Sequence, residues 1–82
     1  MNKISQTDML KVLADAFDVP LAGLNPNTPR DTIDGWDSMG ALTLMAELDE
    51  RFSLQLTADE SRKMTKISDV FLYLRTNGAL LD

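Results

Sequence analysis

The segment from Asp18 to Asp37 limits the folds open to this chain more than any other feature. It shows neither a helical nor a strand period, and it is broken by Pro20, Gly23, Pro26, Pro29 and Gly35. Proline cannot continue a helix or a central strand because it lacks a backbone N–H. A loop of this length inside a small domain is unusual and often carries function. Apolar residues within it predict an ordered loop pinned to a helical core, namely Val19, Leu21, Leu24 and Ile33.

Helical patterns on both sides of this loop predict four helices, over residues 5–17, 38–52, 57–64 and 66–77. Ser5 and Thr57 are each followed three residues later by an acidic residue, which is a helix-start signal. Gly78 is placed to end the last helix in the left-handed conformation. The 82 residues are too few for two ordinary domains. We therefore expect one all-α domain over 1–82, a four-helix bundle with a short third helix.

The apolar residues also predict which side of each helix is buried. On the first helix these are Met9, Leu13, Ala16 and Phe17, and on the fourth they are Ile67, Val70, Phe71 and Leu74. On the second helix the expected core side holds Ala41, Leu42, Met45, Leu48 and Phe52. The opposite, exposed side holds Met39, Thr43, Ala46, Glu47 and Glu50.

The composition excludes several kinds of chemistry. The chain has no cysteine and no histidine, so it offers no disulfide, thiolate, imidazole base or ordinary zinc site. A self-contained Ser-His-Asp catalyst is impossible. A calcium loop around Gly35 fails because its first and twelfth positions would be Arg30 and Ala41. We expect a protein that is not an enzyme, with no catalytic residue and no bound metal.

The charge balance points to the kind of partner. Thirteen acidic residues against eight basic ones give a net charge of −5. This argues against nucleic acid or an anionic membrane as a partner and favours a basic protein surface. No apolar run approaches the ~20 residues that span a bilayer. The N-terminus lacks the apolar core of a signal peptide. We expect a cytoplasmic protein that is a monomer.

The most informative motif lies where the long loop meets the second helix, in Gly35-Trp36-Asp37-Ser38-Met39. It resembles the acyl carrier protein family, whose signature is Asp-Ser-Leu at the start of the second helix. Further similarities follow in the family's order, in Leu48-Asp49-Glu50-Arg51-Phe52, in the run from Lys63 to Val70 and in Tyr73-Leu74. The resemblance covers roughly residues 5–77, and its order and spacing are specific although an Asp-Ser pair alone is not.

The resemblance implies a covalent cofactor on Ser38. A phosphopantetheinyl transferase would attach 4′-phosphopantetheine from coenzyme A to its hydroxyl, and the thiol of this arm would carry an acyl group as a thioester. Asp37 would help the transferase to hold its metal and Ser38. From position alone, both residues are good helix caps, and a serine at a helix start is usually nothing more. The cofactor would supply the thiol that the chain lacks.

The resemblance also implies partners and a pathway. The exposed side of the second helix would be the docking face for a loading enzyme and for downstream synthases or transferases; its residues are Met39, Thr43, Ala46, Glu47 and Glu50. The alternative is that this side contacts only solvent. Trp36 is either a hydrophobic lid, which we favour, or a partner contact. Gly-Trp-Asp-Ser is similar to free-standing carriers of specialised, polyketide-like pathways. Gly40, expected to leave a bare surface beside the arm, and Thr43 stand where fatty-acid carriers often have acids. The alternatives are an aminoacyl or peptidyl carrier, or a helical interaction module that is never modified.

Overall fold

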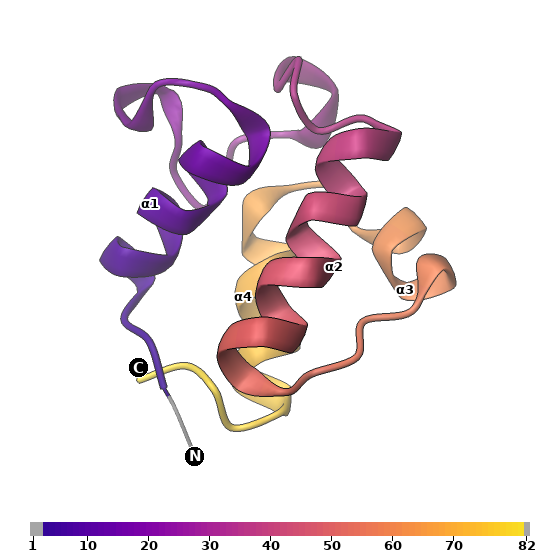
Figure 1. The fold of residues 1–82 in the computed structure, drawn as a ribbon. Coiled ribbons are helices and arrows are strands. Elements are labelled where there is room, and N and C mark those ends of the chain that lie inside the picture. The colour runs from indigo at the N-terminus through magenta and orange to yellow at the C-terminus, as the bar shows by residue number, and fades with distance from the viewer. Residues whose placement is uncertain (1–2, 82) are drawn as a thin grey trace.

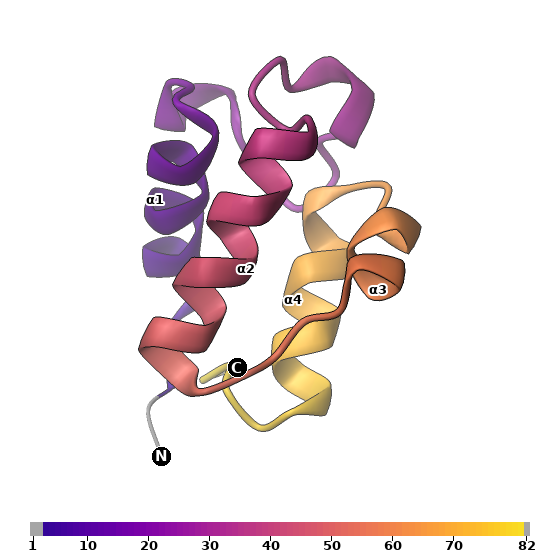
Figure 2. The same cartoon turned by 45° about the vertical axis from the view of Figure 1, so that its right-hand side comes forward.

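The protein is described by a computed structural model over residues 3–81. Its helices are α1 (Gln6–Phe17), α2 (Ser38–Phe52), α3 (Ala58–Lys63) and α4 (Ile67–Thr76). In both views α2 lies beside α1 and α4, while the short α3 stands to one side (Figures 1 and 2). Residues 3–81 contain no strand, only the isolated bridges Ile4–Leu80 and Pro29–Lys66. The predicted all-α, four-helix class is confirmed.

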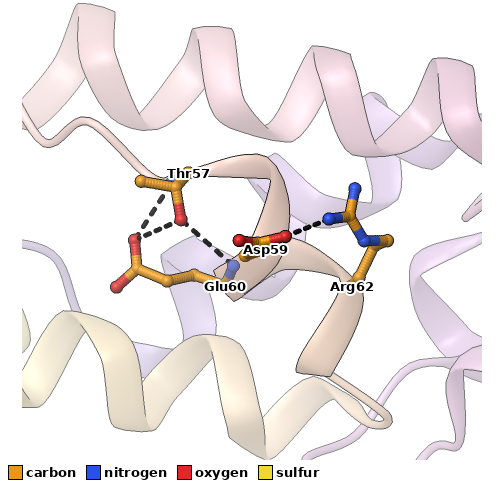
Figure 3. Close-up of polar contacts among 4 residues, drawn as sticks. All are labelled: Thr57, Asp59, Glu60 and Arg62. Carbon is orange, nitrogen blue, oxygen red and sulfur yellow. Dashed lines mark hydrogen bonds and ion pairs between the residues drawn. The ribbon is translucent and has the colours of Figure 1, made fainter.

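Local chemistry fixes the helix ends. The Ser5 hydroxyl accepts a hydrogen bond from the Asp8 N–H at 3.1 Å at the start of α1. A capping box starts α3, in which Thr57 and Glu60 each accept from the other's backbone N–H (Figure 3). Gly78, with φ of 72°, follows α4 in the left-handed conformation, as predicted. Left-handed non-glycine residues end the first two helices: Asp18 after α1 and Ser53 after α2.

The long loop is pinned to the core through Leu24 and Ile33, which are buried as expected, whereas Val19 is half-buried and Leu21, also expected to pin it, is exposed. The loop also caps another helix. Lys66 starts α4 without a side-chain cap. Instead, the Ile67 N–H donates to the Thr28 carbonyl at 3.1 Å and the Ser68 N–H donates to the Pro26 carbonyl at 2.8 Å. The loop backbone thus satisfies N–H groups that have no partner inside the helix. Two short 3₁₀ turns, Leu21–Gly23 and Arg30–Thr32, lie within this loop.

The buried side of α2 differs from the prediction. Leu42, expected in the core, has 60% of its surface exposed, whereas Leu44 is completely buried. Met45 and Phe52 are only half-buried, packed against the edge of the core. Successive residues of a helix are about 100° apart, so Leu42 points well away from its neighbour Ala41. Because the buried side of α2 is centred near Leu48, Leu42 lies outside it. The predicted core residues of α4 are all buried, and so are those of α1 except Ala16, which is half-buried.

The segment before α1 and the segment after α4 meet at the opposite end of the bundle from the long loop (Figures 1 and 2). The Ile4 N–H donates to the Ala79 carbonyl at 2.9 Å, and the Leu81 N–H donates to the Ile4 carbonyl at 2.9 Å. Ala79 and Leu80 are buried in the common core. Residues beyond the last helix therefore complete the fold.

No helix in the described part of the chain has the length and apolar character needed to cross a membrane. The same residues hold no group of three or more acidic side chains that could bind a metal ion.

Asp69 gives the fold a pH-dependent contribution. Its carboxylate accepts from the Thr65 backbone N–H at 2.8 Å and from the Thr65 hydroxyl at 3.1 Å. The backbone hydrogen bond is the main reason that the pKa of Asp69 lies below its ordinary value. A lowered folded-state pKa means that this stabilisation is complete above the unfolded-chain pKa of about 4 and is lost as the pH falls through the folded value.

We expect Asp69→Asn to lower the free energy of unfolding at pH 7 by about 0.5–1 kcal/mol, a modest loss because water screens this partly exposed group. Urea unfolding of both proteins at pH 7 and in acid is the measurement. The difference should vanish in acid, where both side chains are neutral. An equal loss at both pH values would contradict an ionic origin.

Candidate functional site

Ser38 is the first residue of α2 and lies exposed where the long loop enters the helix. The helix cap is Asp37, which has extended backbone angles and accepts from the Gly40 N–H at 2.9 Å through Oδ1. Both residues are candidate caps from their position alone, and the structure gives that role to Asp37. The Ser38 hydroxyl is therefore not needed to start the helix.

Two glycines allow the loop to approach this point closely. A Cβ on Gly35 would lie 1.6 Å from the carbonyl oxygen of Phe17, and one on Gly40 would lie 1.9 Å from the carbonyl oxygen of Gly35. The end of α1, the loop and the first turn of α2 thus touch through their backbones. The expectation that Gly40 leaves a bare surface is wrong, since Gly40 is buried by this crossing. The close approach of the two backbones therefore requires glycine at position 40.

Trp36 closes the same region from the side of the loop. Only 4% of its surface is exposed, and its ring stacks on that of Phe17 with centroids 4.8 Å apart. The guanidinium carbon of Arg30 lies 5.2 Å from the centre of the Trp36 ring. This burial supports the interpretation of Trp36 as a hydrophobic lid over that of a partner contact, because a partner could touch little of the side chain.

The outer face of α2 carries most of the expected docking residues. Met39 is 73% exposed, and Thr43, Ala46 and Glu50 are also exposed. Glu47 is partly covered because it accepts from Arg51 Nε at 2.6 Å, and this bond is the main reason that the pKa of Arg51 is raised. Leu42 also lies on this face, although the spacing of the apolar residues of the helix predicts that it is buried in the core. We call Met39, Leu42, Thr43, Ala46, Glu47 and Glu50 the α2 outer face.

A pocket of about 800 Å³ lies between the long loop and the segment after α3. Its lining includes Ile33, Trp36 and Met64 as apolar residues and Arg30 and Arg62 as basic ones. Sequence reasoning missed both the pocket and Arg30. A single basic residue inside an aperiodic loop carries no signal of a tertiary contact.

The arrangement around Ser38 is compatible with a covalently attached phosphodiester. The hydroxyl is exposed, so a modifying enzyme can reach it. The N-terminus of the 15-residue helix α2 favours an anion through its dipole and its free N–H groups. Asp37 occupies only one of these groups, the Gly40 N–H. The site therefore fits the group that the sequence resemblance implies.

Comparison with known proteins bears on this interpretation. No protein-family model matches the chain. The chain is 26% identical, over 70 residues, to the acyl carrier protein of Helicobacter pylori (strain J99), and the match covers 85% of this chain and 90% of that protein. It extends over nearly the whole of both proteins, so it includes more than the short motif at Ser38. The chain is therefore similar over most of its length to an acyl carrier protein, and its all-helical, four-helix architecture is consistent with that similarity.

Proposed function

We propose that this protein carries an acyl intermediate on a 4′-phosphopantetheine arm attached to Ser38 and presents it to the enzymes of a biosynthetic pathway. The observation that carries the proposal is the exposed Ser38, placed after the capping Asp37 in a chain similar to an acyl carrier protein. A general carrier role follows from that similarity, and carriers of this kind are not enzymes. The arm, the cargo and the site residues are our proposal.

Each residue of the site has a distinct role in this proposal. The Ser38 oxygen would be joined to the phosphorus of the arm, and the first turn of α2 would face the phosphodiester. Asp37 would hold that turn in place and present its outer oxygen to the metal of the transferase. When bound, the arm supplies a thiol, the nucleophile that a chain without cysteine cannot provide.

We further propose a specialised, polyketide-like pathway in place of primary fatty-acid synthesis. Gly40 does not support this choice, because backbone packing explains it. The support comes from Trp36 in the motif and from the neutral Thr43 and Ala46 on the α2 outer face. In this proposal the chain is one domain over 1–82, a cytoplasmic monomer that meets a transferase, a loading enzyme and downstream synthases.

Intact-mass measurement tests the cofactor directly. The purified protein, incubated with coenzyme A and a broad-range phosphopantetheinyl transferase, should gain the mass of one phosphopantetheine. A protein that stays unmodified while a known carrier is converted in the same reaction would favour the helical interaction module. Loading assays with acyl and aminoacyl donors would then separate an acyl carrier from an aminoacyl or peptidyl carrier.

The α2 outer face should bind the partner enzymes, and Leu42 offers the sharpest test. It is 60% exposed one helical turn after Met39, so the two form an apolar patch beside Ser38. We expect Leu42→Ala to lower kcat/KM for acyl loading of the modified carrier roughly tenfold, the effect of losing about 1.4 kcal/mol of interface contact.

Leu72→Ala is the matched control, since Leu72 is 56% exposed on α4 and should leave loading unchanged. Equal effects of the two variants would argue against docking on α2. Charge is tested separately with Glu50→Lys, because Glu50 is exposed and Glu47 is engaged with Arg51. That variant should slow loading most at low salt, where screening of charge is weakest.

A further inference from the structure

Arg30 connects three parts of the molecule that are separate in sequence. Its Nη1 donates to the carbonyls of Ser61 at 3.0 Å and Met64 at 3.3 Å, and its Nε donates to the carbonyl of Trp36 at 3.4 Å. Its guanidinium carbon lies 5.2 Å from the centre of the Trp36 ring. One half-buried side chain thus bonds to the end of α3 and to the loop two residues before Ser38.

The helix that Arg30 holds is otherwise stabilised mainly within itself. Helix α3 has only six residues, and an isolated helix of this length is unstable in water. Its capping box and its Arg62–Asp59 ion pair are both local (Figure 3). Ser61 is its one buried residue, and Met64, directly after the helix, belongs to the core; Arg30 binds the carbonyls of both. Arg30 therefore binds α3 where this helix meets the core.

We propose that Arg30 is a positioning residue that keeps α3 and the loop before Ser38 in one arrangement, and so fixes the Ser38 hydroxyl for modification. This inference rests on the proposed function of Ser38. The mechanical connection is short: Arg30 holds the Trp36 carbonyl and ring, Trp36 stacks on Phe17, and Asp37 follows as the cap of α2.

The geometry needs arginine in particular. A guanidinium is planar and presents its donors in a fixed fork, so it can bind several carbonyls while its face lies near an aromatic ring. A lysine ammonium keeps the charge but is a point donor. The backbone N–H of residue 30 donates to the Thr65 carbonyl at 2.8 Å, so a side-chain substitution leaves that link intact.

The test compares Arg30→Met with Arg62→Met as the matched control. Arg62 lines the same pocket and carries the same charge, but it pairs with Asp59 inside α3 (Figure 3). Steady-state kinetics of the transferase with each carrier as substrate is the measurement. Misplacement of Ser38 should lower kcat roughly tenfold in Arg30→Met, because it disturbs the reacting geometry. Arg62→Met should change kcat less than about twofold, since it leaves this geometry intact.

A purely structural role would give a different result. Partial unfolding lowers the concentration of competent carrier, which raises the apparent KM and leaves kcat unchanged at saturation. That pattern in Arg30→Met would overturn the proposal. Arg30→Lys should recover less than roughly half of the lost kcat, because lysine lacks the fork. Complete recovery with lysine would also overturn the proposal.

Two further measurements do not depend on the cofactor. Hydrogen exchange of the Met64 N–H, which donates to the Ser61 carbonyl at 3.2 Å, should become faster in Arg30→Met and not in Arg62→Met. The emission of Trp36, the one tryptophan in the chain, should shift to the red as the ring loses its cover. If the unsubstituted protein is never modified, the proposed function fails, and these two measurements alone decide whether Arg30 orders the loop and α3.

Discussion

Replacing Ser38 with alanine should abolish modification completely. The unsubstituted protein should gain one phosphopantetheine on incubation with coenzyme A and a transferase, whereas Ser38→Ala should keep its original mass at every time point. The effect is all-or-none because the serine oxygen is the atom that would join the protein to the arm. Intact-mass spectrometry over a time course is the measurement.

The fold should survive this substitution, so that a loss of modification can be attributed to the missing hydroxyl. Asp37 caps α2, and Ser38 is exposed at the first helical position, so its hydroxyl is dispensable for the helix. Circular dichroism of Ser38→Ala should match that of the unsubstituted protein. Ser53→Ala is a suitable control, since Ser53 is exposed at the other end of α2 and should not alter modification. A mass gain that persists in Ser38→Ala would contradict the assignment.

The second large effect is expected in the core, at Leu44. This side chain is completely buried on α2, and Leu44→Ala should lower the free energy of unfolding by about 2–5 kcal/mol. A loss of this size is serious for a small domain, whose total stability is about 5–15 kcal/mol. Chemical denaturation followed by circular dichroism, with comparison of midpoints and slopes, is the measurement.

Leu42→Ala tests whether α2 buries the side seen in the structure or the side predicted from the spacing of its apolar residues. Leu42 is 60% exposed, so its truncation should change stability by no more than about 0.5 kcal/mol. The two substitutions remove the same atoms from nearby positions of one helix. If Leu42→Ala proved the more damaging, the core face assigned to α2 would be wrong, and Leu42 could not belong to a docking face.

The crossing at Gly35 and Gly40 explains how a proline-rich loop can present Ser38 in a fixed position. The loop is anchored at several points, among them its hydrogen bonds to the first N–H groups of α4, the hydrogen bonds of Arg30 and the stacking of Trp36 on Phe17. None of these anchors needs a long regular element in the loop itself. The chain therefore enters α2 from a loop that is held by tertiary contacts, although the sequence of the loop has no helical or strand period.

Short-range sequence chemistry determined much of the fold. The helix starts at Ser5 and Thr57 and the stop at Gly78 are local signals, because a cap needs only residues within one turn. The core stripe of α4 follows from its 3.6-residue period alone, and all four predicted residues are buried. The candidate site at Ser38 rests on the Asp37-Ser38 motif taken together with the order and spacing of the other similarities along the chain, and it stays a prediction.

Only the tertiary structure decided the features that depend on where other segments lie. Leu42 and Leu44 are the same residue type, and the side on which α2 packs against other segments, α1 among them, leaves Leu44 buried and Leu42 exposed. The sequence suggests a functional substitution at Gly40, but a backbone oxygen 1.9 Å from its missing Cβ requires glycine there. Arg30 gives no signal, since its partners Ser61 and Met64 lie 31 and 34 residues away along the chain. A sequence pattern reports what repeats along one element, whereas contacts between elements follow from how the whole chain packs.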